Sequence, residues 1–197
     1  MLTLLIDMDG PTAGLPEVWY PAYNRDWSTC PEEDLTPEKI TRWGIHDLVK
    51  PECGLKIYDY LKKPGIYGNA PPVPGAIEAL RYLNRKHIVY MATHVLKGPG
   101  YLEKAEWVDR YLPFIGHDRI WMGKDKYMLR GDMLLDDGPE NLIKFPGVTI
   151  CWDELYNQHV IPNYRLVGSP EARWEEVIYV VDRYAMLKKL GCTRAPD

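Results

Sequence analysis

The 197-residue sequence has few cysteines, only two phenylalanines, no long apolar run and no excess of positive charge. No stretch reaches the about 18 apolar residues that a membrane-crossing helix needs, so we expect no membrane partner. The four cysteines are scattered and form no CxxC pair, a pattern typical of reduced thiols rather than of a disulfide frame or a zinc site. The sequence therefore predicts a cytoplasmic protein.

The charge balance argues against a second class of protein. With a formal net charge of -4, the chain lacks the basic excess by which proteins grip polymeric nucleic acid. A small anionic ligand is still compatible, because a local pocket can be positive on an acidic protein. We therefore expect a small-molecule partner and no polymeric nucleic acid, and the sequence leaves a homodimer open.

Apolar runs and helical patterns alternate over most of the chain. Residues 2–6 are a continuous apolar run that carries no basic region, so we expect a buried strand there rather than a signal peptide. The alternation that follows predicts an α/β protein with a doubly wound parallel sheet. The other expected strands are residues 87–92, 120–122, 133–135 and 147–151, and the expected helices are residues 76–85, 102–111 and 174–187.

Residues 14–72 interrupt this alternation with a segment rich in proline, tryptophan and charge. We expect short helices within it, one at residues 36–39 with Thr36 as N-cap and Pro37 at the first helical position, and another at residues 54–61. The sequence thus predicts a core formed by residues 1–13 and 73–197, with a small, mostly helical insertion. We call residues 14–72 the cap segment.

Polar side chains follow three of the expected strands, at the edge of the sheet where open α/β proteins bind ligands. Asp7 and Asp9 follow the first, Thr93 the second, and Asp136 and Asp137 the fourth. Carboxylates that lie close together repel one another and need a cation nearby. A set of oxygen ligands without His or Cys indicates that this cation is Mg²⁺. Either acidic motif alone could be an ordinary turn. The occurrence of both after apolar runs favours a site.

Three motifs of this sequence resemble those of haloacid dehalogenase (HAD) superfamily phosphatases: residues 5–10 (LIDMDG), 90–93 (YMAT) and 134–137 (LLDD). The likeness is closer to the 5′(3′)-deoxyribonucleotidases and covers nearly all of residues 1–187. The segments that support this branch are residues 72–76 (PVPGA), 101–108 (YLEKAEWV), 124–126 (KDK) and 157–159 (NQH), followed by Trp174.

The resemblance implies a HAD-like core and a Mg²⁺-dependent phosphomonoesterase that dephosphorylates (deoxy)nucleoside monophosphates. Asp7 would attack phosphorus and form an aspartyl-phosphate, while Asp9 would act as general acid and then base. Thr93 would donate a hydrogen bond to a phosphoryl oxygen. Mg²⁺ would be held by the side chains of Asp7 and Asp136 and by the carbonyl of Asp9, with Asp137 orienting the metal shell.

The family also uses a lysine to stabilise the transferring phosphoryl group, and this chain has two candidates. We favour Lys104, because its position matches the nucleotidases and a helix N-terminus after a strand points at anions. Lys126, closer to the fourth strand, is the alternative.

Selectivity would come from the cap and from the loop after the second strand. Trp43 resembles a residue that stacks on the base, although it could instead pack the cap against the core. His94 stands where nucleotidases commonly carry Ser and could contact phosphate or base. Lys97 could meet the phosphate.

Two other functions remain open on the sequence alone. The same chemistry could act on another small phosphate ester, such as a sugar phosphate. A non-catalytic binding module on the same scaffold is the other alternative, and the presence of both Asp7 and Asp9 disfavours it.

Overall fold

The computed structural model describes residues 1–192 and contains a six-stranded, fully parallel sheet in the order β3-β2-β1-β4-β5-β6. This confirms the predicted α/β class. β1, β4 and β5 are buried along almost their whole length, as expected for strands covered on both faces, whereas Tyr90 of β2 is exposed and β3 is half-buried. Their bounds are β1 Thr3–Asp7, β2 Ile88–Thr93, β3 Ile120–Met122, β4 Met133–Asp136, β5 Val148–Trp152 and β6 Tyr164–Leu166.

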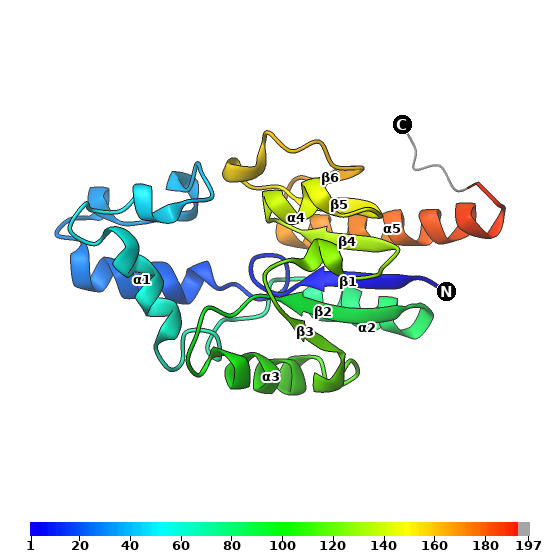
Figure 1. Ribbon diagram of the computed structural model, residues 1–197, viewed down its shortest axis with the longest axis horizontal. Helices are drawn as coiled ribbons and strands as arrows, with labels where there is room; N and C mark the ends of the chain where they lie inside the picture. Colours follow the sequence, from blue (N-terminus) through cyan, green and yellow to red (C-terminus); the bar gives the residue numbers. More distant parts are fainter. Residues whose placement is uncertain (193–197) are drawn as a thin grey trace.

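Helices cover both faces of the sheet (Figure 1). The main core cluster joins one face to α2, α3 and α5, with Leu80, Trp107 and Trp174 fully buried among its members. The opposite face packs against α4 and the 3₁₀ turn Lys126–Met128 through smaller clusters. The α-helices are α1 Pro16–Trp27, α2 Ala76–Lys86, α3 Gly100–Tyr111, α4 Pro139–Lys144 and α5 Pro170–Lys189. Within residues 1–192, none of the helices has the length and apolar character needed to cross a membrane.

The register of the sheet brings the polar strand ends together. β1 is central and pairs with both β2 and β4, so that Asp7 lies opposite Ala92, and Ile6 lies opposite Leu135. Thr93 and Asp136, each one residue beyond these partners, therefore flank Asp7 at one edge of the sheet. Figure 1 shows that this edge faces the cap segment.

Three elements were not expected from the sequence. α1 contains Pro16 and an internal Pro21, and its helical conformation is supported by packing of Tyr20 and Tyr23 into a hydrophobic cluster. α4 and β6 have six and three residues, too few for a clear apolar period. Around residue 37 the helix is only a 3₁₀ turn, and the side chain of Thr36 makes no capping hydrogen bond.

The cap segment has a hydrophobic cluster of its own, formed largely by α1 and the long 3₁₀ helix Gly54–Lys62. The chain leaves and re-enters the core at adjacent points, because Ala13 and Pro72 form an antiparallel bridge. Gly14 N donates to Pro71 O at 2.8 Å, which closes the base of the insertion. These features support the division at residues 14 and 72, which remains an interpretation.

The returning end of the cap segment is attached to α3 by the carboxylate of Glu103. One oxygen accepts a hydrogen bond from Gly65 N at 2.7 Å. The other accepts from Tyr67 N at 3.1 Å and Gly68 N at 3.0 Å. Backbone donors in a turn have few other partners, so a single side chain fixes the path of the chain here.

We expect Glu103→Ala to destabilise the protein by about 2 kcal/mol, because three part-buried backbone donors would lose a charged acceptor. Urea unfolding monitored by circular dichroism measures this loss. The neighbouring Glu106→Ala, on the exposed side of the same helix, is the control and should change the free energy of unfolding by less than about 0.5 kcal/mol. Equal effects of the two substitutions would contradict this role for Glu103.

Candidate active site

The carboxylates at the ends of β1 and β4 form a compact buried group. Oxygen atoms of Asp7, Asp136 and Asp137 all lie within 4.8 Å of one another. Backbone amides orient two of these side chains: Met8 N donates to Asp7 Oδ1 and Gly138 N donates to Asp136 Oδ1, both at 2.7 Å. The predicted strand-end acids are thus brought together.

The turn after β1 requires glycine at position 10. Gly10 has φ of 96°, a conformation that L side chains rarely adopt. A Cβ at this position would also lie 3.0 Å from Asp137 Oδ2. The turn is closed by Thr12, whose hydroxyl donates to Asp7 O at 2.7 Å. Gly10 therefore lets the backbone pass close to the acidic group without placing a side chain in it.

Lys126 lies inside this group. Its Nζ is 2.7 Å from Asp7 Oδ1 and 3.0 Å from Asp136 Oδ2. Burial disfavours the charge on Lys126, but the carboxylates of Asp136 and Asp7 outweigh this effect and raise the lysine pKa. Its backbone is held by Asn141, whose Oδ1 accepts from Lys126 N at 3.0 Å. Lys126 is therefore a fixed positive charge beside Asp7.

Lys104, the lysine favoured from the sequence, lies beside Asp9 instead. It is completely buried and forms an ion pair with Asp9. Its Nζ also donates to Thr93 Oγ1 at 2.5 Å and to His94 O at 3.0 Å. The ring of Tyr67 from the cap segment lies over this ammonium group at 4.4 Å. Lys126 thus lies next to Asp7, and Lys104 lies next to Asp9.

Burial and mutual repulsion disfavour ionisation of the aspartates in the site. Burial raises the pKa of Asp7 and of Asp9, against the opposing effects of Lys126 and Lys104. Burial, and then Asp7 and Asp136, raise the pKa of Asp137 well above its usual value. With all six groups ionised, the four carboxylates would exceed the two ammonium groups by two negative charges. A divalent cation would neutralise this excess.

The donor set fits such a cation. All ligand atoms of the group are carboxylate oxygens, which suit Mg²⁺, Ca²⁺ or Mn²⁺. Asp136 Oδ2 is buried without a hydrogen-bond donor, since Lys126 lies close to it but lacks hydrogen-bond geometry. The carboxylate of Asp9 lies outside this group and bonds to Lys104. That position agrees with an assignment in which Asp9 offers only its carbonyl.

Two of the predicted substrate-binding residues lie at the edges of the site. Trp43 is 60% exposed, and the edge of its ring system lies 3.4 Å from a Cβ built on Gly138, directly after the acidic pair. His94 is exposed, and its carbonyl rather than its ring contacts Lys104. Partial desolvation by the neighbouring residues, and then the charge of Lys104, lower the pKa of His94, which favours a neutral ring at pH 7.

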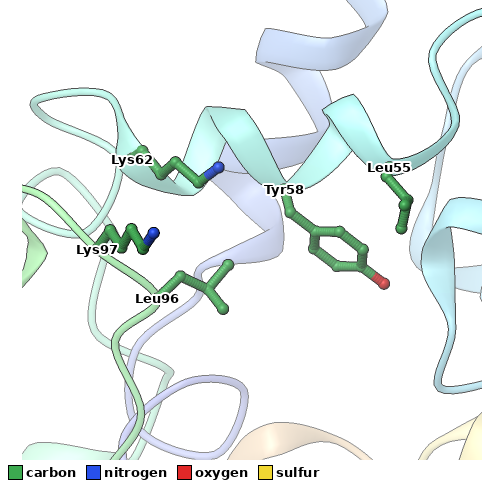
Figure 2. A pocket seen from close by; sticks show the side chains of 5 residues that line it. All are labelled: Leu55, Tyr58, Lys62, Leu96 and Lys97. Atoms are coloured by element: carbon green, nitrogen blue, oxygen red, sulfur yellow. The ribbon is translucent and has the colours of Figure 1, made fainter.

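Lys97 belongs to a separate hollow between cap and core. Leu55, Tyr58 and Lys62 of the cap segment and Leu96 and Lys97 of the core line this cavity of about 350 Å³ (Figure 2). Among the contacts of residues 1–192, no hydrogen bond or ion pair joins Lys97 to the aspartates of the site. The structure therefore places Lys97 beside the site rather than in it.

Two residues of the site were not predicted. Tyr156 donates a hydrogen bond to Asp137 Oδ2, and Tyr67 covers Lys104. Neither lies at the end of a strand, and no spacing in the sequence connects either tyrosine to its partner. Tyr156 precedes the segment 157–159, which carried part of the family resemblance, and this was the only signal near it.

The fold is that of the HAD-like proteins. The HAD-hydrolase YfnB from Bacillus subtilis superposes with a TM-score of 0.59 and 12% identity, over 91% of this chain and 98% of that one. The haloacid dehalogenase-like protein SP0104 from Streptococcus pneumoniae gives a TM-score of 0.58 and 11% identity with the same coverage. At these identities the likeness shows the fold.

Sequence comparison identifies the family. The profile described as 5′ nucleotidase, deoxy (Pyrimidine), cytosolic type C protein matches residues 1–185. A 5′(3′)-deoxyribonucleotidase from Clostridium acetobutylicum is 35% identical over 158 residues, 79% of this chain and 84% of that protein. The human cytosolic-type 5′(3′)-deoxyribonucleotidase is 25% identical over 190 residues, 89% and 92% of the two chains.

The chain belongs to this 5′-nucleotidase family and is a phosphoric monoester hydrolase. The resemblance seen in the sequence is thereby confirmed.

We expect Asp137→Asn to stabilise the metal-free protein at pH 8. The raised pKa means that ionising Asp137 costs more in the folded than in the unfolded chain, whose pKa is about 3.9. The cost is absent below that pH, grows as pH rises, and is complete above the folded-state pKa. Relief of this cost should raise Tm at pH 8.

Thermal melts in a chelator at pH 4 and pH 8 test this expectation, and the gain should be confined to the higher pH. Asp118→Asn, at an exposed aspartate, is the control and should leave Tm unchanged. A lower Tm for Asp137→Asn at pH 8 would show that its ionised form does not destabilise the fold.

Proposed function

We propose that this hydrolase dephosphorylates nucleoside monophosphates through a covalent intermediate on Asp7, with Mg²⁺ as its cofactor. The observation that carries the proposal is the placement of Asp7 at the end of β1, buried beside Lys126 and within the acidic group. Membership of a 5′-nucleotidase family supports the nucleotide substrate.

The contacts of Asp7 suit a nucleophile. Met8 N and Lys126 Nζ both contact Oδ1, each at 2.7 Å. No hydrogen bond or ion pair within residues 1–192 involves Oδ2, so this atom is free to attack phosphorus. The P–O bond to the nucleoside breaks as the Asp7–phosphorus bond forms, and water then releases phosphate. Two such displacements are each easier than one direct hydrolysis.

Asp9 is the proposed general acid and base. It is two residues beyond Asp7, it keeps 25% of its side chain exposed, and burial raises its pKa. A raised pKa favours the protonated form that donates a proton to the leaving alkoxide. The resulting carboxylate can then take a proton from the attacking water. Lys104 holds this carboxylate and the Thr93 hydroxyl in place, and Thr93 is positioned to meet a phosphoryl oxygen.

We propose the opposite order of preference for the two lysines from the one that the sequence favoured. Lys126 contacts Asp7 directly, so we assign to it the stabilisation of the transferring phosphoryl group. Lys104 contacts Asp9 and Thr93 and is assigned to positioning these two residues. Sequence alone could not separate the two, since either lysine could have been a solvated surface charge.

The side chains of Asp7 and Asp136, with the carbonyl of Asp9, are the proposed Mg²⁺ ligands, and Asp137 orients the shell. The buried Asp136 Oδ2 without a donor supports this assignment. When bound, Mg²⁺ would neutralise phosphate charge and align the substrate with Asp7.

The base is proposed to stack on Trp43. This side chain is exposed and lies at Gly138, so a ring stacked on it would reach from the cap toward the acidic group. The human relative is a cytosolic-type enzyme, which supports a cytoplasmic location.

We expect Asp7→Asn to lower kcat by at least about a thousandfold, because an amide is a far weaker nucleophile than a carboxylate. Hydrolysis of thymidine monophosphate measures the loss, and a circular dichroism spectrum checks the fold. Acid-quenched wild-type enzyme should carry hydroxylamine-sensitive phosphate that Asp7→Asn lacks. Substantial turnover by the variant would rule out the aspartyl-phosphate.

We expect Trp43→Ala to lower kcat/KM for deoxyuridine or thymidine monophosphate by about 5–150-fold, the equivalent of one stacked base. The loss on p-nitrophenyl phosphate, which has no base, should be small. Tyr179→Ala, on α5, removes a side chain of similar exposure, 61%, and serves as the control. Equal losses on both substrates would show that Trp43 is structural. A wild-type preference for sugar phosphates would contradict the nucleotide assignment.

A further inference from the structure

Tyr156 lies between the acidic group and the cap segment and contacts both. It belongs to the 3₁₀ turn Leu155–Asn157 that follows β5. Its hydroxyl donates to Asp137 Oδ2, and its ring packs against the hydrophobic cluster of the cap segment. The ring centroids of Trp43 and Tyr156 are 5.4 Å apart with an interplanar angle of 65°, an edge-to-face contact.

The turn that carries Tyr156 is rigidly attached to the core. Asn157 Nδ2 donates to Asp137 O at 3.0 Å and to Trp152 O at 2.8 Å. Arg165 Nη1 in turn donates to Asn157 Oδ1 at 3.0 Å. The turn thus holds Asp137 twice, at its carbonyl through Asn157 and at its carboxylate through Tyr156.

Asp137 has little other support on its side-chain oxygens. In the described part of the chain, the Tyr156 hydroxyl is the one hydrogen-bond donor to this carboxylate. On the opposite side Gly10 approaches without a side chain, and a Cβ there would lie 3.0 Å from Asp137 Oδ2. The orientation of the Asp137 carboxylate therefore depends on Tyr156.

We infer that Tyr156 is a positioning residue that orients Asp137 toward the metal and ties this orientation to the cap through Trp43. The inference rests on the proposed metal site. A residue that orients the ligands of a metal strengthens metal binding more when a hydrogen bond fixes its side chain than when that side chain is free. The aromatic contact makes the position of the Tyr156 ring, and hence of its hydroxyl, depend on where Trp43 lies.

The test is direct binding of Mn²⁺, a cation that also prefers oxygen ligands. The electron paramagnetic resonance signal of the free ion measures how much Mn²⁺ is bound. Tyr156→Phe removes one oxygen and keeps the ring, and it should raise the Mn²⁺ Kd about tenfold. Trp43→Ala keeps the Tyr156 hydroxyl and should raise the Kd about threefold. The double variant should lose no more than Tyr156→Phe alone, because both substitutions act through one hydrogen bond.

Tyr60→Phe is the matched control, since it removes a buried tyrosine hydroxyl that donates to Asp26 at 2.6 Å within the cap segment. Its Mn²⁺ Kd should equal that of wild type. A wild type that binds no Mn²⁺ would contradict the metal site itself. An unchanged Kd in Tyr156→Phe, with a wild type that does bind, would overturn only the inference. An unchanged Kd in Trp43→Ala, or an about thirtyfold loss in the double variant, would overturn the tie to the cap.

Discussion

Mutual repulsion among buried carboxylates is the constraint on which the arrangement of this protein depends. Asp7, Asp136 and Asp137 bring their oxygens within 4.8 Å of one another, in a place where burial already raises the pKa of Asp7 and Asp137. Such a group is stable only where cations are close. Lys126, between the ends of two strands, supplies one such cation to Asp7 and Asp136. The well-packed face of the sheet against α2, α3 and α5 stabilises the fold, which the acidic site does not.

The centre of the sheet could be predicted because β1, β4 and β5 are buried on both faces and read as largely apolar runs. Asp7, Thr93 and Asp136 were predicted to meet because parallel strands end at the same edge, and the register places them there. α1 could not be predicted, since Pro21 argues against a helix and only the tertiary contacts of Tyr20 and Tyr23 favour it. β6 has three residues, too few for a pattern.

Within the site, the sequence identified the acids and left the cations and their neighbours open. Nothing in the sequence separates Lys104 from Lys126, and both are buried in the structure, so only the distance of 2.7 Å to Asp7 distinguishes Lys126. Tyr156 and Trp43 are 113 positions apart in the chain and meet only because the cap folds back over β4 and β5. Contacts of this kind depend on tertiary structure and have no local signature.

The base of the cap has a consequence for how such enzymes can change. Residues 13 and 72 form a bridge, so the 58 residues between them begin and end at nearly the same point of the core. Because its ends already meet, an insertion of different length would add little closure entropy to the core. A segment of another length could therefore be joined at this bridge without moving the strand ends that carry Asp7, Thr93 and Asp136.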